Sequence, residues 1–290
     1  MVRGASTPIA AMPVPPLLLD YHRKNNRATG ARWEGFAEHR ARMTMLALQA
    51  PGQTLAVLGA GNCNDLDLPA LAGRFRQIHL VDLDEEAVRR ARDRQPAAVA
   101  AKLVLPAPLD LSGAFDRLAA FKNKPATTAE QTRLPAASAQ KVLQALPGPF
   151  DVVMSACLLS QLMHSCYVAL GLQHPQLHLV AAALAVAHLR SLAALLAPGG
   201  TGLIVTDTIS SETYALEELW SDRPPLALLE EIDRNDRTLT NTAPSFLRRI
   251  LREDAEVAPL VSPPRLVDPW LWRFTDEMTF MVYALVFQRR

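Results

Sequence analysis

Short apolar runs alternate with longer amphipathic segments between residues 53 and 206, and this alternation constrains the fold more than any other feature of the chain. A short apolar run bounded by turn residues predicts a buried strand, and an amphipathic segment predicts a helix. A chain that alternates the two builds a parallel sheet with crossover helices. The strands are expected at Thr54–Leu58, Ile78–Val81, Lys102–Leu105, Phe150–Met154 and Gly202–Thr206.

The pattern changes after residue 206. Two helical stretches, Glu212–Asp233 and Pro244–Asp254, precede two final runs with strand character, Arg265–Thr275 and Thr279–Gln288. The two runs follow one another closely, which predicts an antiparallel hairpin. The fold class is therefore α/β: a doubly wound, Rossmann-like sheet of seven strands, mostly parallel, with an antiparallel strand from the C-terminal hairpin.

The segments between the strands are expected to be helical. Leu111–Pro147 predicts a helix, a mobile insertion and a second helix, and Leu158–Leu196 predicts helix with a break near Gly171–Pro175. Before the first strand, apolar residues of Arg32–Gln49 recur at spacings of three and four, which predicts a helix with one buried face.

These elements form one domain, residues 53–290, and residues 20–52 are expected to form an N-terminal helical extension that acts as a lid. Residues 1–19 are expected to form a flexible, proline-bearing tail. They do not resemble a signal peptide, because several prolines interrupt the apolar core that a signal peptide needs. The longest apolar run begins at Leu179–Ala187 and falls short of the roughly 20 residues needed to cross a bilayer. No membrane association is expected.

The charges of the chain nearly balance, since 30 basic and 29 acidic residues give a formal net charge of +1. No global field attracts this protein to a polyanion, so nucleic acid is disfavoured and a small-molecule partner is favoured. The three cysteines are too few for a disulfide framework. They favour a reducing compartment, and a cytoplasmic location is expected.

The most informative motif lies in Val57–Asp65. A strand ends at Gly59, Gly61 follows two residues later, and a helix is expected from Asp65. Glycines at such a turn let the backbone approach a ligand that a Cβ would block. Asp82 closes the second strand, where a carboxylate accepts the hydroxyl protons of a ribose. The combination predicts a nucleoside ligand, and the alternative is a tight turn followed by an acid that caps the next helix.

In these features, over about residues 53–290, the chain resembles the class I S-adenosylmethionine-dependent methyltransferases. A Pro198-Gly199-Gly200 turn before the fifth strand and the final hairpin are also usual in that family. The resemblance implies S-adenosylmethionine as methyl donor, with contacts from the residues that close the first four strands. With Asn64 and Asp65 added from this chain's own residues, the expected donor-binding residues are Gly59, Ala60, Gly61, Asn64, Asp65, Asp82, Leu83, Asp110, Leu111, Ser155 and Ala156.

Two positions depart from the family's pattern. An acid is often found where this chain has Val57, and a glycine where it has Cys63. Asn64 and Asp65 are our candidates to replace the missing polar contacts to the amino and carboxylate groups of the donor. Asp65 is equally suited to cap a helix, and the two roles can coexist.

The acceptor side is less defined, because alignment in a dry site supplies much of the rate of methyl transfer. A base is needed only where the acceptor must lose a proton. The catalytic candidates are Tyr21, His164 and Asp207, and Asn26 and Trp33 of the lid are candidates to line the pocket. Structural roles are the alternatives: Trp33 as an anchor of its helix, His164 as a hydrogen-bonded structural histidine, and Asp207 as a helix cap.

No metal site is expected. The gaps between His164, Cys166, His174 and His178 match no zinc pattern. The basic residues between Arg23 and Arg42 predict a solvated helix face, because no stacking platform or basic tail accompanies them.

The sequence thus predicts methyl transfer from S-adenosylmethionine to an unidentified small-molecule acceptor. One alternative is an NAD-dependent oxidoreductase, which shares the strand, the glycine loop and the acid. It is disfavoured by Asn64, which stands at the third-glycine position of a dinucleotide loop, and by the final hairpin. A second alternative is a catalytically silent methyltransferase-like module that binds a partner protein, and Val57 and Cys63 keep it open.

Overall fold

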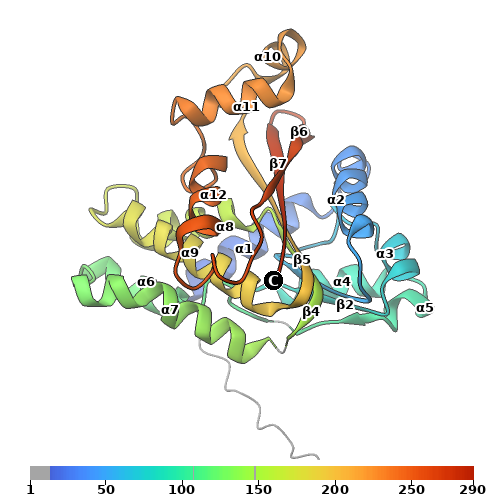
Figure 1. The fold of residues 1–290 in the computed structure, drawn as a ribbon, viewed down its shortest axis with the longest axis horizontal. Coiled ribbons are helices and arrows are strands. Elements are labelled where there is room, and N and C mark those ends of the chain that lie inside the picture. The colour runs from blue at the N-terminus through green and yellow to red at the C-terminus, as the bar shows by residue number, and fades with distance from the viewer. Residues whose placement is uncertain (1–13, 107, 147) are drawn as a thin grey trace, which may run out of the picture.

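A mixed sheet runs through the centre of the computed structural model, which describes residues 14–106, 108–146 and 148–290 (Figure 1). Its strands are β1 (Thr54–Leu58), β2 (Gln77–Val81), β3 (Leu103–Val104), β4 (Phe150–Ala156), β5 (Leu196–Ser210), β6 (Arg265–Arg273) and β7 (Thr279–Gln288). Their order is β3-β2-β1-β4-β5-β7-β6. The first five strands pair in parallel, and β7 lies antiparallel between β5 and β6. The predicted fold class, a doubly wound and mostly parallel seven-stranded sheet with an antiparallel strand from the C-terminal hairpin, is confirmed.

Helices cover both faces of this sheet. They are α1 (Pro16–Thr29), α2 (Ala37–Gln49), α3 (Leu68–Arg74), α4 (Glu85–Asp93), α5 (Ala97–Ala100), α6 (Phe115–Asn123), α7 (Thr128–Ala145), α8 (Leu158–Leu170), α9 (Leu177–Leu195), α10 (Leu216–Asp222), α11 (Pro225–Arg234) and α12 (Pro244–Glu253). Helices α2 to α5 lie on one side, and α1 with α6 to α9 on the other (Figure 1). Helices α10 and α11 lie at the far end of the β6–β7 hairpin.

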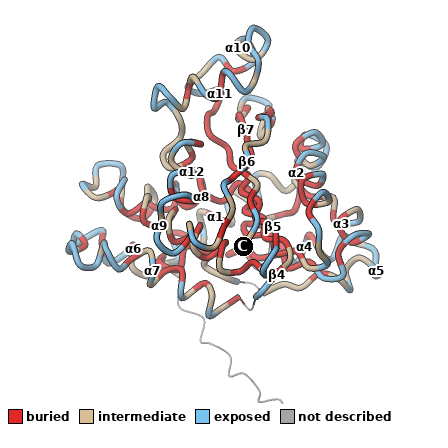
Figure 2. The backbone as a smooth tube through the Cα atoms, viewed as in Figure 1, coloured by how far each residue is buried: buried red, intermediate tan, exposed pale blue. Residues whose placement is uncertain are grey.

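The core lies in two layers because alternate residues of each central strand face opposite sides. In β1, Leu55 and Val57 pack with α2 to α4, whereas Ala56 and Leu58 pack under α6 to α9. A parallel strand buried on both faces is an almost continuous apolar run, which explains why the sequence located β1 without error. Figure 2 shows the buried residues concentrated along the strands and the inner sides of the helices.

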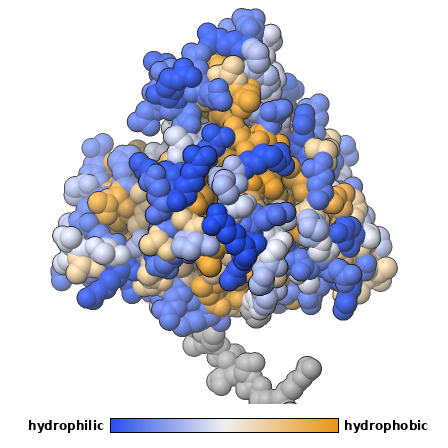
Figure 3. Space-filling view, viewed as in Figure 1, coloured by the Kyte–Doolittle hydropathy of each residue, from blue (hydrophilic) through white to orange (hydrophobic). Residues whose placement is uncertain are grey.

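Helix α9 has 19 residues and is, within the described residues, long and apolar enough to cross a membrane. We expected this run to be too short, but the polar residues that interrupt it are accommodated within the helix. His188 Nε2 lies 2.8 Å from the Ser155 hydroxyl, and the Ser191 hydroxyl donates to the Ala187 carbonyl. About 61% of the apolar stretch is buried, so α9 is packed as a core helix. Hydrophilic side chains cover most of the visible surface, and apolar ones gather near its upper centre (Figure 3).

The N-terminal segment differs from its prediction. Helix α1 begins at Pro16, so part of the expected tail is helical, while residues 1–13 lie outside the described residues. Proline is favoured in the first turn of a helix because the amide it lacks has no partner there, and Leu18 buries its side chain in the core. Helix α2 begins only at Ala37, five residues later than expected.

Two other boundaries also differ. The expected mobile insertion is a short linker, residues 124–127, whose Ala126 is buried and donates its amide to Gln176 Oε1. The turn at Pro198-Gly199-Gly200 lies inside β5, where the register with β4 shifts between Phe150 and Val152.

A buried polar contact joins α2 to the hairpin. Trp270 Nε1 donates to His39 Nδ1 at 2.9 Å, and the His39 ring stacks on Trp272 with centroids 4.2 Å apart. Burial lowers the pKa of His39 to about 3, which keeps the ring neutral and Nδ1 able to accept. This contact fixes the hairpin against the segment that leads into the first strand.

Trp270→Phe is therefore expected to destabilise the protein by about 1–3 kcal/mol beyond the loss of packing, since it leaves a buried ring nitrogen without its donor. Trp272→Phe is the matched control, because its Nε1 has no partner among the described residues. Urea unfolding of both variants measures the difference. Equal losses in the two variants would show that the hydrogen bond contributes nothing.

Candidate functional site

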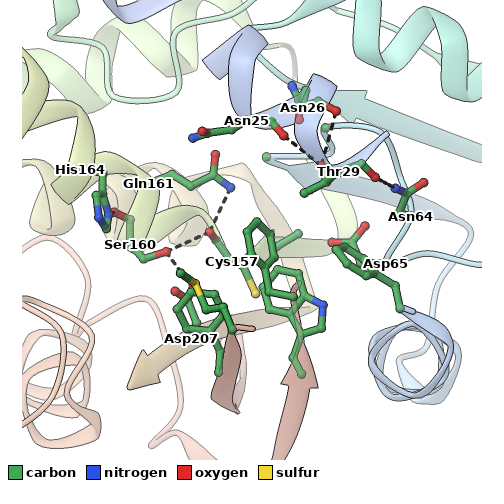
Figure 4. Close-up of a pocket in the computed structure, with 18 of the residues that line it drawn as sticks. Asn25, Asn26, Thr29, Asn64, Asp65, Cys157, Ser160, Gln161, His164 and Asp207 are labelled. Atoms are coloured by element: carbon green, nitrogen blue, oxygen red, sulfur yellow. Dashed lines mark hydrogen bonds between the residues drawn. The ribbon is translucent and has the colours of Figure 1, made fainter. Parts of the chain in front are cut away.

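A cavity of about 360 Å³ opens at the carboxyl ends of β1, β4 and β5. This is the edge at which open α/β sheets collect ligands, and the volume suits a small molecule. Its walls come from α1, the loop after β1, the start of α8, the segment after β5, and the β6–β7 hairpin (Figure 4). Five segments far apart in the sequence thus converge on one space.

The loop after β1 has the backbone conformation that its glycines predict. Gly59 and Gly61 have φ angles of 85° and 49°. Cys63 adopts the same left-handed region at φ 52°, where an L residue is disfavoured by roughly 1–2 kcal/mol. Cys63 therefore occupies a site at which glycine would be the unstrained choice, which explains the family's preference at this position.

Asp82 holds this loop in place. Its carboxylate accepts from the Gly61 amide and from the Asp84 amide, each at 2.8 Å. Burial raises the pKa of Asp82 to about 6, opposed by these hydrogen bonds. Both oxygens are thus already engaged by backbone, and Asp82 lies outside the lining of the cavity.

The end of α1 covers the loop. The Asn26 side chain donates to Asp84 Oδ2 at 3.1 Å, and its Oδ1 lies 3.0 Å from the place of a Cβ on Gly61. In return, Asn62 Nδ2 donates to the Asn26 carbonyl, and Asn64 Nδ2 donates to the Thr29 carbonyl. Helix α1 thus sits on the first loop and on the end of β2, as a lid would.

Asn64 and Asp65 form one polar end of the cavity (Figure 4). Asn64 Oδ1 is buried and has no partner in the described part of the chain, while Arg40 donates to the Asn64 carbonyl at 2.9 Å. Burial raises the pKa of Asp65 to about 7. The cap of α3 is Asp67, which accepts from the Ala70 amide, so Asp65 does not serve as that cap.

Asp207 lies at the opposite end, beside α8. Ser160 donates to Asp207 Oδ1 at 2.7 Å, and burial raises the pKa of this carboxylate. His164, one turn further along α8, is exposed at the rim and bonds through Nδ1 to the Ser160 carbonyl. Tyr21 faces the same space from α1, and burial raises the pKa of its phenol. All three catalytic candidates therefore line one cavity, and Asp207 caps no helix.

Four aromatic rings form the remaining wall. Trp272 contacts Phe36, Phe274 and Phe280 with ring centroids 5.0 to 5.8 Å apart. These four residues were not among the predicted site residues. The available signal was the spacing of Trp272, in β6, and Phe274, just after it, because residues two apart in extended chain share a face.

The structure brings together most of the predicted site residues. Those that line the cavity are Tyr21, Asn26, Gly59, Ala60, Gly61, Asn64, Asp65, Ala156, His164 and Asp207. Those that lie outside its lining are Trp33, Asp82, Leu83, Asp110, Leu111 and Ser155.

Local hydrogen bonds and packing account for the second group. The Ser155 hydroxyl is buried against His188, and Leu111 packs in the core. Asp110 accepts from the Ser112 hydroxyl and the Phe115 amide at the start of α6. The Arg40 guanidinium lies over the Trp33 ring, with its Cζ atom 3.6 Å from the ring centroid of Trp33.

The histidines considered for metal binding have separate partners. His174 Nε2 lies 3.1 Å from the Phe121 carbonyl, whereas His164 bonds to its own helix. Within the residues that the structure describes, no group of three His, Cys, Asp or Glu side chains is placed to hold a metal ion.

Comparison with known proteins concerns the fold. No protein-family model matches the chain, and no curated protein matches it. Among solved structures, it is similar to an O-methyltransferase family protein from Burkholderia thailandensis (16% identity, TM-score 0.43), covering 92% of this chain and 59% of that one. It is also similar to TrmN from Thermus thermophilus (14% identity, TM-score 0.44), covering 90% of this chain and 53% of that one. It is similar as well to an S-adenosylmethionine-dependent methyltransferase from Methanosarcina mazei (11% identity, TM-score 0.44), covering 85% of this chain and 96% of that one.

The chain thus spans somewhat more than half the length of the first two of these proteins. Similarity at this level carries no conclusion about chemistry, so what the cavity does is argued from its own residues.

Asp65→Asn is expected to change the pH dependence of stability. The folded-state pKa of Asp65 is about 7, above its ordinary value of 3.8, so folding takes up a proton between these pH values. The wild type should gain stability relative to Asp65→Asn as the pH falls from 8 to 5, because the buried charge is then neutralised. Urea unfolding across this range measures the effect, with the exposed Asp268→Asn as control. A constant difference between wild type and Asp65→Asn would contradict the raised pKa.

Proposed function

We propose that this protein transfers a methyl group from S-adenosylmethionine to a small-molecule acceptor in this cavity. The observation that carries the proposal is the lining of the cavity. A glycine loop, carboxylates and an aromatic wall surround it, and no Lys or Arg is among its described lining residues. Carboxylates and aromatic faces attract cations, and the donor is a sulfonium with an ammonium group.

The amino-acid half of the donor fits the residues present. The unpartnered Asn64 Oδ1 and the Asp65 carboxylate are acceptors for an ammonium group. Gly59 and Gly61 leave room for the ligand to approach the backbone. These are the residues that would hold this half.

The nucleoside half fits only after a local movement. Asn26 lies on Gly61 and Asp84, and both oxygens of Asp82 are held by backbone amides. The end of α1 must therefore shift before a ribose reaches Asp82. A ribose hydroxyl that binds Asp82 Oδ2 would compete with the Gly61 amide, which donates to the same oxygen.

When bound, the donor supplies an activated methyl group. The protein orients the acceptor toward it and excludes water, which supports transfer by alignment. Asp207 is placed to accept a proton from the acceptor, and the exposed His164 lines the same cavity one helical turn after Ser160, the hydrogen-bond donor of Asp207. Cys157 also lines the cavity, but burial raises its pKa well above the ordinary value, so its thiol stays neutral.

The oxidoreductase alternative is disfavoured by charge. A dinucleotide places its pyrophosphate at the N-terminus of the helix after the glycine loop. Here Asp65 and Asp67 stand at that place, and their carboxylates would repel the phosphates.

A silent binding module differs from an enzyme in having no donor affinity or no turnover.

A cytoplasmic location, proposed from the sequence, agrees with three buried and unpaired cysteines.

Titration with S-adenosylhomocysteine tests the donor site. We expect binding by calorimetry, and we expect Asn26→Ala to bind about fivefold more tightly. The variant removes a hydrogen bond worth about 1 kcal/mol that the ligand must otherwise displace. Asn123→Ala, in an exposed turn of α6, is the matched control and should leave the affinity unchanged.

Failure of both the wild type and Asn26→Ala to bind, while NAD binds, would overturn methyl transfer. Tighter binding by the wild type than by Asn26→Ala would show that Asn26 holds the ligand and does not obstruct it.

A further inference from the structure

The two ends of the cavity carry separate acids (Figure 4). Asp65 belongs to the loop after β1, whereas Asp207 follows the parallel part of β5 and lies against α8. Glu212, which follows β5, adds a third carboxylate to the lining. A donor ammonium at Asn64 and Asp65 leaves the Asp207 end without a cation.

Asp207 is 5% exposed, and the Ser160 hydroxyl is the only side chain that donates to it in the described part of the chain. A buried carboxylate without a positive partner is costly, which is why burial raises the pKa of Asp207, and a ligand that brings a cation offsets part of that cost. An alcohol would leave the charge uncompensated, and an acidic acceptor would be repelled. The electrostatics of this end therefore select for an ammonium ion.

The aromatic wall of the same cavity selects for a flat apolar body. Phe36, Trp272, Phe274 and Phe280 present aromatic surface within the cavity, where stacked rings and cations both bind favourably. Trp272 is 8% exposed, and its Nε1 is buried without a partner among the described residues.

Building on the proposed methyl transfer, we propose that the acceptor is a primary or secondary alkylamine whose carbon chain bears an aromatic ring. Its nitrogen lies at Asp207, and its ring lies against the aromatic wall.

The reaction balances with the residues present. The acceptor enters as an ammonium ion and gives one proton to the Asp207 carboxylate, which frees the nitrogen lone pair. That pair forms the N–C bond to the methyl carbon while the C–S bond breaks and its electrons remain on sulfur. The methylated ammonium leaves, and Asp207 returns its proton to water past His164. A carboxylate is a strong enough base to deprotonate an ammonium ion at this site. It is poorly suited to deprotonate an alcohol, which is a far weaker acid than ammonium.

Calorimetry with three matched probes tests the assignment in the full-length protein saturated with S-adenosylhomocysteine. The probes are 2-phenylethylamine, 2-phenylethanol and 3-phenylpropanoate, which share the ring and differ in charge. We expect the amine to bind at least tenfold more tightly than the alcohol, and the carboxylate to bind least. Asp207→Asn should reduce amine affinity at least tenfold while the affinity for S-adenosylhomocysteine changes less than twofold. Asp268→Asn, an exposed acid on β6, is the control.

Equal binding of the amine and the alcohol, or full amine affinity in Asp207→Asn, would overturn the assignment. Phe274→Leu keeps the test decisive if Asp207→Asn fails to fold, since loss of the ring should weaken the amine more than fivefold. If S-adenosylhomocysteine binds and no amine binds, the amine acceptor is rejected and the proposed methyl transfer is retained. If the amine binds through Asp207 and S-adenosylhomocysteine does not bind, the cation site at Asp207 is retained and the proposed methyl transfer is rejected.

Discussion

The hydrogen bonds from the Gly61 and Asp84 amides to Asp82 are the constraint on which the site depends. They connect the end of β2 to the loop after β1 and so fix where that loop presents its side chains. Asn62 and Asn64, on the same loop, donate to the carbonyls at the end of α1. Loop position, lid position and the shape of the cavity therefore follow from one buried carboxylate.

The same arrangement places the end of α1 over the loop after β1, where its residues form part of the cavity lining. It also places Asn26 against Gly61 and Asp84, where a nucleoside would lie. The contacts at this point are a few hydrogen bonds, each contributing about 1 kcal/mol net, so an incoming ligand can replace them. Donor binding as proposed therefore requires the end of α1 to move away from Gly61 and Asp84.

Much of the fold could be predicted from the sequence because its strands are apolar on both faces. The bounds of β1 and β7 followed from this pattern, while β6 ends two residues before its expected end, and Gly59 and Gly61 located the turn. The start of helix α1, residues 16–19, was missed because the buried side of this helix is short, with Leu18 and His22 as its buried residues. Periodicity over so few positions gives a weak signal.

The candidate site was predicted in part. Asn64, Asp65 and Asp207 line the cavity because they follow strand ends at one edge of the sheet, which chain order alone indicates. Asp110 lies outside the cavity lining because its partners, Ser112 and Phe115, lie just after it and close a local cap, which the residue types at the strand end do not indicate. The aromatic wall was missed because it joins residues more than 200 positions apart, and no local pattern reveals such a contact.

A crystal structure of the protein with S-adenosylhomocysteine tests the central claim most directly. The account predicts the amino group of the ligand at Asn64 and Asp65, its sulfur facing Asp207 across the cavity, and a ribose hydroxyl at Asp82 with Asn26 displaced from Gly61. A cavity that stays empty at saturating ligand, with Asn26 still seated on Gly61, would contradict it.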